Sequence, residues 1–367
     1  MKIVVDDKIP FFKGVFESVA EVVYLPGKDI TQTAVSDADA LLVRTRTRCD
    51  EKLLANTSVR FVGTATIGFD HIDTDFCKKH RIFWTNAPGC NADSVAQYVL
   101  SSLLYISLTK NISLSDKIVG IIGVGNVGQK VATLLQTFGM KVLLNDPPRS
   151  LKESGFVSLN HLLEASDIIT FHTPLTYIGQ YPTFHMADIH FFNKLKKKPI
   201  ICNTARGEVI DTKGLQQAIE RGKISDLILD CWENEPDIDS GILQNALLAT
   251  PHIAGYSADG KANATKMIVR KLADYFHLAI DLPCISLPET AFPIIDLDEF
   301  PKNRIEQAIL KTYCPKTDSL LLKNDPEHFE QFRNNYSTRR EFKGYIIRHA
   351  RPDEVRLLKG LGFQIEV

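Results

Sequence analysis

The first hundred residues alternate short apolar, β-branched runs with segments whose apolar positions recur at helical spacing. Strand-like runs occupy residues 3–5, 22–25, 41–43, 60–62 and 82–84. Strands that alternate with helices are typical of a parallel sheet covered by helices on both faces. The pattern therefore predicts an α/β domain with a doubly wound parallel sheet in this part of the chain.

A second series of the same kind follows a long apolar segment at residues 91–108, which we expect to form one helix. Further strand-like runs lie at 118–122, 141–144, 168–171, 199–202 and 227–229, each followed by helical sequence. Residues 258–280 predict another long helix, after which Pro283, Pro288 and Pro293 interrupt the pattern as a linker does. We therefore expect two doubly wound sheets and a third, smaller segment.

The chain's 367 residues exceed what one ordinary core accommodates, which predicts several domains. Lys plus Arg (43) balance Asp plus Glu (44), so no overall field favours nucleic acid or an anionic membrane as a partner. No CxxC spacing or basic and apolar leader occurs, so we expect reduced thiols, no metal site and a cytoplasmic location. The scattered cysteines are Cys49, Cys77, Cys90, Cys202, Cys231, Cys284 and Cys314.

A glycine-rich turn, Gly123-Val124-Gly125-Asn126-Val127-Gly128, follows a predicted strand and begins a predicted helix. Its glycines allow close approach of the backbone to a pyrophosphate, whose charge then meets the helix N-terminus. The next strand ends on Asp146, at the distance where an acid accepts hydrogen bonds from both hydroxyls of a ribose. An acid there repels a 2'-phosphate, so the turn predicts binding of NAD rather than NADP.

Three more motifs each follow a predicted strand or apolar stretch: Asn203-Thr204-Ala205-Arg206-Gly207, Glu233-Asn234-Glu235-Pro236 and Thr250-Pro251-His252-Ile253-Ala254-Gly255. The Arg206 guanidinium suits a carboxylate through paired hydrogen bonds. His252 suits proton exchange with a hydroxyl or carbonyl, and Glu235 would hold its tautomer and favour its cation. Taken singly, these residues could be a surface arginine, a structural histidine and a solvated acid. Together they favour hydride transfer from a hydroxy acid.

These motifs, with Gly63-Thr64-Ala65-Thr66, Gly68-Phe69-Asp70-His71-Ile72-Asp73 and Asp230-Cys231-Trp232-Glu233, resemble the D-isomer-specific 2-hydroxyacid dehydrogenase family. The specific motifs span about residues 1–285, and the tail resembles the family more loosely. The resemblance implies a flavodoxin-like substrate domain (1–92 and 257–285), an inserted Rossmann NAD domain (93–256) and a small C-terminal α+β dimerisation domain (286–367). Because a segment of about 75 residues buries little surface alone, we expect a homodimer through this tail.

By the same resemblance, Arg206 binds the substrate carboxylate, His252 is the acid/base and Glu235 is its partner. The residues implied at NAD, besides the glycine turn, are Asp146, Thr173, Ala205, Asp230 and Gly255. Those implied at the substrate are Thr45, Thr66 and Tyr256, with Arg44 and Arg46 as candidates for a phosphate. Arg348 or Arg351 from a partner subunit are alternatives for the phosphate, and the basic run at 44–48 could also be plain surface.

The substrate is thus expected to be a small phosphorylated hydroxy acid. An aromatic hydroxyl at Tyr256, close to His252 in sequence, favours a longer polyhydroxy acid. Relatives that act on a shorter phosphorylated acid share the core motifs and often carry a C-terminal regulatory domain of similar size. A third possibility is an NAD-sensing corepressor, which the complete set of Arg206, Glu235 and His252 disfavours.

Overall fold

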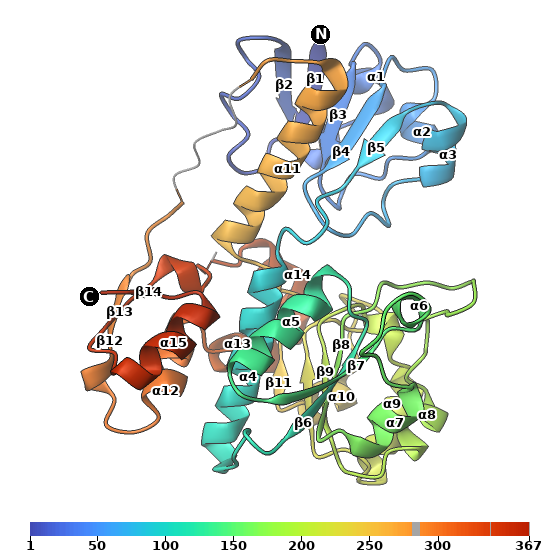
Figure 1. Ribbon diagram of the computed structural model, residues 1–367. Helices are drawn as coiled ribbons and strands as arrows, with labels where there is room; N and C mark the ends of the chain where they lie inside the picture. Colours follow the sequence, from blue (N-terminus) through green and yellow to red (C-terminus); the bar gives the residue numbers. More distant parts are fainter. Residues whose placement is uncertain (281–286, 338, 367) are drawn as a thin grey trace. The chain divides into compact units, whose positions relative to one another are not determined.

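The computed structural model describes residues 1–280, 287–337 and 339–366, which form two compact units (Figure 1). The first unit comprises Met1–Asn91 and Ala258–Pro288, and the second comprises Ala92–Ser257 and Glu289–Val367. The tail therefore belongs to the same compact unit as the second sheet. The division into three domains stays a prediction.

The first unit contains a five-stranded parallel sheet in the order β2-β1-β3-β4-β5, as in flavodoxin-like folds. The strands lie at the runs that the sequence pattern predicts. They are β1 (Lys2–Asp6), β2 (Glu21–Leu25), β3 (Ala40–Val43), β4 (Phe61–Thr64) and β5 (Phe83–Thr85). The helices are η1 (Gly27–Asp29), α1 (Gln32–Val35), α2 (Glu51–Leu54), α3 (Thr74–Lys79) and α11 (Ala258–Phe276).

Both faces of this sheet are buried, because side chains alternate along each strand. Val4 and Leu41 point into one core, which the short helices α1, α2 and α3 complete. Ile3 and Phe61 point into the other, where α11 supplies Ile268 and its neighbours. The long helix that follows the histidine motif in sequence therefore closes the sheet formed by the N-terminal segment.

The second unit contains a six-stranded parallel sheet in the order β11-β10-β9-β8-β6-β7. Its strands are β6 (Ile118–Ile122), β7 (Lys141–Asn145), β8 (Ile168–Phe171), β9 (Ile200–Asn203), β10 (Asp226–Leu229) and β11 (Leu248–Ala249). Its helices are α4 (Ala92–Lys110), α5 (Asn126–Thr137), α6 (Pro147–Ser150), α7 (Leu159–Ala165), α8 (Ile189–Asn193), η2 (Gly207–Val209), α9 (Thr212–Glu220) and α10 (Ser240–Asn245).

The strand order of this sheet reverses at β6, whose neighbours are β7 on one side and β8 on the other. In open parallel sheets, ligands bind beyond the carboxyl ends of the strands at such a switch point. The glycine turn follows β6 and the His172-Thr173 pair follows β8, so both lie at this position. The predicted Rossmann arrangement is confirmed.

Helix α4 is buried on almost all sides, with Tyr98, Leu100 and Leu103 inaccessible to solvent. It packs against α5 and against α12 (Arg304–Thr312) of the tail. A helix that is buried all round belongs to the centre of a large domain. α4 therefore forms the middle of the second unit.

The tail forms three parallel strands in the order β12-β13-β14, joined by helices. Its elements are β12 (Ile294–Asp296), η3 (Leu297–Glu299), α12 (Arg304–Thr312), α13 (Lys316–Asn324), η4 (Pro326–His328), α14 (Phe329–Asn334), η5 (Phe342–Gly344), β13 (Ile346–Arg348), α15 (Pro352–Leu361) and β14 (Gln364–Ile365).

Many apolar side chains of the tail are buried within the second unit itself. Ile309 of α12 and Leu358 of α15 are fully buried in one core with Val99 of α4 and Val131 of α5. Figure 1 shows α12 and α15 beside α4 and α5. Phe329 enters the core on the opposite face of the sheet. The second unit thus covers part of the apolar surface of the tail, whereas Leu320 and Leu321 of α13 are each 49% exposed. The dimer itself stays a prediction.

The tail also covers the open edge of the six-stranded sheet. The backbone N–H of Ala249 in the edge strand β11 donates to Ser319 Oγ of α13 at 3.0 Å. From the same helix, the Lys323 ammonium donates to the carbonyl of Ala246. Edge strands expose unpaired backbone groups, and α13 satisfies them here.

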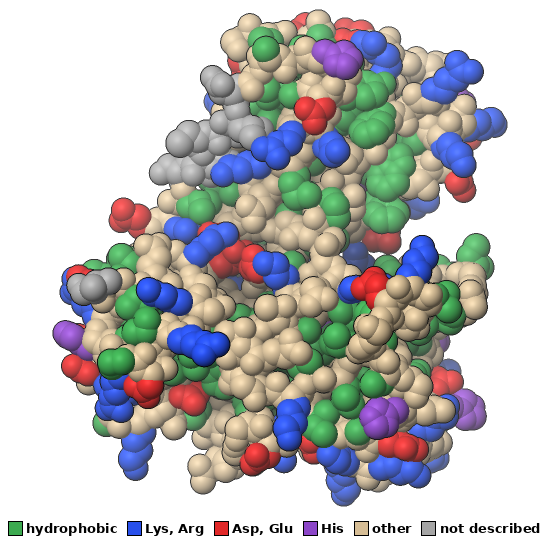
Figure 2. Space-filling view, viewed as in Figure 1, with side chains coloured by type: hydrophobic (Ala, Val, Ile, Leu, Met, Phe, Trp, Pro, Cys, Tyr) green, Lys and Arg blue, Asp and Glu red, His purple; other side chains and the backbone are tan. Residues whose placement is uncertain are grey.

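Acidic and basic side chains are interspersed over the face shown in Figure 2. The cysteines among the described residues are Cys49, Cys77, Cys90, Cys202, Cys231 and Cys314, and they carry free thiols. Cys284 lies outside the described residues. Among the described helices, none combines the length and the apolar composition that a membrane crossing needs.

The shared core predicts that a cavity in the tail destabilises the second unit as a whole. Ile309→Ala removes a fully buried side chain and should lower the free energy of unfolding by about 2–5 kcal/mol. Ile178→Ala is the matched control, because Ile178 is 88% exposed. Denaturant unfolding followed by fluorescence and circular dichroism measures both variants. A tail that melts separately, while the remaining signal keeps its wild-type midpoint, would contradict the shared core.

Candidate active site

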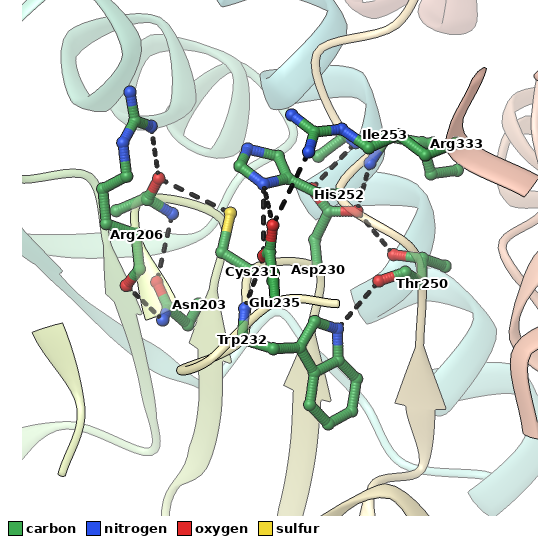
Figure 3. Close-up of polar contacts among 12 residues, drawn as sticks. Asn203, Arg206, Asp230, Cys231, Trp232, Glu235, Thr250, His252, Ile253 and Arg333 are labelled. Atoms are coloured by element: carbon green, nitrogen blue, oxygen red, sulfur yellow. Dashed lines mark hydrogen bonds and ion pairs between the residues drawn. The ribbon is translucent and has the colours of Figure 1, made fainter. Parts of the chain in front are cut away.

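The three motifs downstream of the glycine turn meet at one edge of the six-stranded sheet. The arginine motif follows β9, the glutamate motif follows β10 and the histidine motif follows β11. These strands are adjacent and parallel, so their carboxyl ends deliver the motifs side by side (Figure 3). The topology thus brings together Arg206, Glu235 and His252, as the sequence predicts.

His252 and Glu235 form a hydrogen-bonded pair. His252 Nδ1 lies 2.9 Å from Glu235 Oε2 and 3.2 Å from Oε1, and Oε1 also accepts the backbone N–H of Trp232 at 2.8 Å. Burial acts to raise the pKa of Glu235, but the charge and hydrogen bond of His252, the Trp232 N–H and the Arg333 charge together lower it. An ionised Glu235 only accepts, so the Nδ1 proton lies between the two residues and Nε2 is left to accept a proton.

Residues 250–255 form the loop that carries His252, here called the histidine loop. Asp230, which is almost completely buried, fixes this loop through hydrogen bonds. Asp230 Oδ1 accepts from the Thr250 hydroxyl and the Ile253 N–H, both at 2.7 Å, and Oδ2 accepts from the Ala254 N–H at 2.9 Å. His252 has a left-handed backbone, with φ of 57°, and its N–H donates to the Asp230 carbonyl at 2.8 Å. Asp230 thus fixes the position of His252, and its predicted contact with NAD stays a prediction.

Two further side chains lock the same loop through Thr250. The Thr250 hydroxyl gives its proton to Asp230, so the Tyr98 hydroxyl of α4, 2.7 Å away, must be the donor to Thr250 Oγ1. The indole N–H of Trp232 donates to the Thr250 carbonyl at 2.9 Å. The loop that carries His252 is therefore tied to the central helix and to the loop that carries Glu235.

Arg206 lies in a turn whose backbone is fixed by Asn203. The Asn203 side chain accepts the Ala205 N–H at 3.0 Å and donates to the Arg206 carbonyl at 2.9 Å. A Cβ on Gly207 would lie 1.9 Å from the Trp232 backbone, so only glycine allows the arginine turn to touch the glutamate loop. Arg206 is half-buried, and Figure 3 shows Cys231 between it and the pair.

Glu233, which follows Trp232, has a structural role. It accepts the Thr212 N–H at 3.1 Å and lies 2.5 Å from His185 Nε2. Burial acts to raise the pKa of Glu233, but these hydrogen bonds lower it. The side chains of His185, Asp211 and Glu233 also offer ligand atoms for a metal ion within 4.8 Å of one another. Glu233 therefore anchors the loop from which Glu235 reaches His252.

The glycine turn has the close packing that a pyrophosphate cradle needs. A Cβ on Gly123, where φ is 84°, would lie 2.7 Å from the Thr173 nitrogen, and one on Gly128 would lie 2.0 Å from the Gly123 carbonyl oxygen. Gly125 faces open space, which leaves its backbone open to a ligand. Thr173 Oγ1 is buried and has no hydrogen-bond partner within the described chain. This arrangement fits a dinucleotide at the switch point.

Asp146 lies at the end of β7, where the ribose acid is expected. Its Oδ2 accepts the Val124 N–H of the glycine turn at 2.8 Å, and its Oδ1 accepts the Arg149 N–H at 3.1 Å. A carboxylate accepts about four hydrogen bonds, so both oxygens retain lone pairs for ribose hydroxyls. Nearby, burial lowers the pKa of His172 to about 3, so this imidazole is neutral between the hydroxyls of Thr170 and Thr204.

Four of the predicted substrate residues, Arg44, Thr45, Arg46 and Thr66, belong to the first unit. Arg44 directly follows β3 and is half-buried, whereas Thr45 and Arg46 are exposed. Thr66 follows β4, and its hydroxyl donates to the Gly68 carbonyl at 2.8 Å. Burial lowers the pKa of Lys261 on α11, and the Arg44 charge lowers it further, so two cations lie close together in this unit.

Sequence reasoning missed two basic residues close to these sites. Lys261 carries no motif that links it to Arg44. Arg333 lies on α14 of the tail, where its Nη1 is 3.8 Å from Glu235 Oε2 and its Nε donates to the Tyr256 hydroxyl at 3.3 Å (Figure 3). No local pattern distinguishes Arg333 from other tail arginines, because its contacts are remote in sequence.

Comparison with known proteins agrees with this geometry. Residues 106–254 match the model of the D-isomer specific 2-hydroxyacid dehydrogenase NAD binding domain, and residues 286–362 match a domain of unknown function. The chain is 52% identical to an erythronate-4-phosphate dehydrogenase of Bacteroides thetaiotaomicron, over 95% of this chain and 99% of the relative. It is 42% identical to one of Porphyromonas gingivalis, over 99% of this chain and 100% of that one.

Solved structures of the wider family are similar over most of the chain. A 3-phosphoglycerate dehydrogenase of Entamoeba histolytica with bound NAD+ has a TM-score of 0.65 and 27% identity, covering 78% of this chain and 99% of its own. A D-lactate dehydrogenase of Aquifex aeolicus with NAD and lactic acid has a TM-score of 0.61 and 28% identity. This match covers 76% of our chain and 96% of that enzyme. The six-stranded sheet and the hydrogen bond between Glu235 and His252 agree with these similarities. The chain therefore belongs to the erythronate-4-phosphate dehydrogenases, which are part of the NAD-dependent D-isomer-specific 2-hydroxyacid dehydrogenase family.

Proposed function

We propose that this enzyme oxidises 4-phospho-D-erythronate at C2 to 2-oxo-3-hydroxy-4-phosphobutanoate, in the pyridoxine 5'-phosphate route that the resemblance implies. The observation that carries the chemistry is the His252–Glu235 pair at the same sheet edge as Arg206. The names of the relatives from Bacteroides thetaiotaomicron and Porphyromonas gingivalis support the substrate.

In the oxidative direction, His252 Nε2 takes the proton of the C2 hydroxyl as the C2–H bond breaks and the C2 carbonyl forms. Bound NAD+ supplies the acceptor for the hydride. Glu235 holds the Nδ1 proton and stabilises the imidazolium that results. Arg206 holds the carboxylate next to C2 through paired hydrogen bonds, which orients the hydroxyl toward the base.

The residues that we propose to hold NAD lie at the switch point and the neighbouring strand ends. The Gly123–Gly128 turn and the N-terminus of α5 would receive the pyrophosphate, and Thr173 Oγ1 is a buried hydroxyl at the same place. Asp146 would accept the ribose hydroxyls, which favours NAD over NADP. Ala205, Asp230 and Gly255 are proposed contacts by resemblance alone.

We propose that the phosphate of the substrate binds to Arg44 together with Lys261. Both belong to the first unit, where burial and the Arg44 charge lower the pKa of Lys261, so a bound phosphate would meet two cations. Arg46 is exposed and stays an alternative. Arg348 already pairs with Glu366 within the tail, which makes it a weaker candidate than Arg44. Thr45, Thr66 and Tyr256 complete the proposed substrate set.

The alternative within the family is a D-3-phosphoglycerate dehydrogenase activity. The similarity to such an enzyme is 27% identity, against 52% and 42% for the erythronate-4-phosphate dehydrogenases. An NAD-sensing corepressor catalyses no reaction and does not require an ordered acid/base pair such as His252 and Glu235, so we disfavour that function. Free thiols throughout the described cysteines support our placement of the enzyme in the cytoplasm.

The role of His252 predicts the effect of its removal. His252→Ala should reduce turnover of 4-phospho-D-erythronate by at least about a hundredfold, because general base catalysis is lost. NAD affinity, measured by calorimetry, should change little. Turnover is followed by absorbance of NADH, with 3-phospho-D-glycerate as the comparison substrate. Near-normal turnover in this variant would refute the assignment of the base.

The proposed phosphate site predicts a selective loss of substrate affinity. Arg44→Ala and Lys261→Met should each raise KM for 4-phospho-D-erythronate by about tenfold or more, since hydrogen bonds to charged groups contribute about 1.5–3 kcal/mol. Arg48→Ala is the control, because the Arg48 side chain is 82% exposed and pairs with Asp50. Wild-type turnover of erythronate as fast as that of its phosphate ester would show that no phosphate site exists.

We propose that the enzyme is a homodimer through the tail, with Leu320 and Leu321 of α13 in the interface. Both side chains are 49% exposed, which is unusual for adjacent leucines. Leu320→Asp with Leu321→Asp should shift the mass measured by light scattering from dimer to monomer. Ile178→Asp, at an exposed site outside the tail, should leave the mass unchanged. A dimeric double variant would place the interface elsewhere.

A further inference from the structure

Arg333 is a cation that the C-terminal segment brings to the catalytic pair. It lies on α14, and Phe329 at the start of this helix is fully buried in a core with Leu322. The Arg333 side chain is only 22% exposed. The guanidinium is therefore held in place by the fold of the tail.

Arg333 contacts Glu235, the hydrogen-bond partner of His252, and Tyr256, which directly follows the histidine motif. Its Nη1 lies 3.8 Å from Glu235 Oε2, the same oxygen that lies 2.9 Å from His252 Nδ1 (Figure 3). Its Nε donates to the Tyr256 hydroxyl at 3.3 Å. Burial acts to lower the pKa of Arg333, but Tyr256 and Glu235 raise it overall. The guanidinium therefore stays charged beside the pair.

A second arginine of the tail, Arg339, fixes the histidine loop from its far side. Arg339 is buried, and it donates to the carbonyls of Ile253 at 3.2 Å and Ala254 at 2.5 Å. Its guanidinium also lies 4.2 Å from the ring centre of Tyr313. Arg333 and the loop that carries His252 are thus held by the same segment, so their relative position is fixed.

We propose that Arg333 is a positioning residue of the catalytic pair, so that the C-terminal segment completes the active site of its own chain. This inference rests on the proposed role of His252 as the acid/base. It assigns a function to the region at residues 286–362, whose matching family model has none. Two solved relatives match 76% and 78% of this chain while 96% and 99% of their own chains are covered, so this chain has residues beyond what they share.

The physical role of Arg333 follows from its contact with the same Glu235 oxygen that His252 contacts. The Glu235 carboxylate favours the imidazolium form of His252, and the Arg333 charge opposes it. Arg333 and His252 therefore share one oxygen of Glu235, and the Arg333 charge opposes the formation of a second cation there. Among the described residues, the other charged or titratable groups around the pair include Asp230, Cys231, Arg206, Tyr256 and, at the histidine loop, Arg339.

The contact with Tyr256 gives Arg333 a second effect. A guanidinium only donates hydrogen bonds, so the Tyr256 oxygen is the acceptor in this contact. The hydroxyl proton of Tyr256 must then point toward a different acceptor. Arg333 thereby restricts the direction in which the Tyr256 O–H bond points.

The test compares Arg333→Met with Arg333→Lys in the full-length enzyme. In Arg333→Met, the acid limb of kcat/KM for oxidation should move to higher pH by about half a unit or more, because the charge that opposes the imidazolium is gone. Arg333→Lys should restore part of the wild-type profile. Glu235→Gln should move the same limb to lower pH. Arg356→Met removes an exposed tail charge and should leave the profile unchanged.

A titration of His252 gives a readout that does not depend on turnover. The Cε1–Hε1 correlation of His252, assigned as the one missing in His252→Gln, should titrate at higher pH in Arg333→Met than in the wild type. If His252→Ala is inactive while both readouts are unshifted in Arg333→Met, this inference fails and the proposed function stands. A raised KM with an unshifted profile would also overturn it, because Arg333 would then bind substrate directly. An active His252→Ala would refute the proposed function first.

Discussion

The buried carboxylate of Asp230 is the group on which the geometry of the site depends. Its two oxygens accept three hydrogen bonds from the histidine loop, two of them from backbone N–H groups that flank His252 closely. Moving the loop would leave a buried charge unpaired, which costs several kcal/mol. That cost exceeds the strain of the left-handed backbone at His252, of order 1–3 kcal/mol. The loop therefore has one favoured position.

The rigidity of this loop comes from the core of the second unit. Tyr98 lies on α4, the most deeply buried helix, and its hydroxyl donates to Thr250, which in turn donates to Asp230. Burial raises the pKa of Asp230 despite the charge of His252 and these hydrogen bonds. A perturbed acid in a site is often read as a catalytic group, but here both carboxylate oxygens hold the loop in place. Asp230 therefore supports the loop that carries His252, the group that we propose for proton transfer.

The sequence predicts the parts of this protein that depend on local pattern. The parallel sheets follow from apolar runs, and the Gly123 turn is predictable because a side chain there would clash with Thr173. Arg206, Glu235 and His252 could be grouped because adjacent parallel strands end at one edge. Arg333 could not, since its contact with Glu235 depends on how the tail packs against the sheet. The same holds for Lys261, whose helix returns to the first sheet only after the second is complete.

The hydrogen bond between Ala249 and Ser319 affects the tendency of this protein to aggregate as well as its folding. While α13 is in place, the last strand of the six-stranded sheet has no free edge near Ala249. A chain whose tail has not yet docked presents that edge together with the apolar surface of α4, and both invite another unfinished chain to add a strand. Because the tail follows the sheet in the sequence, newly made chains pass through this state during synthesis. Docking of the tail is therefore also the step that ends the risk of aggregation.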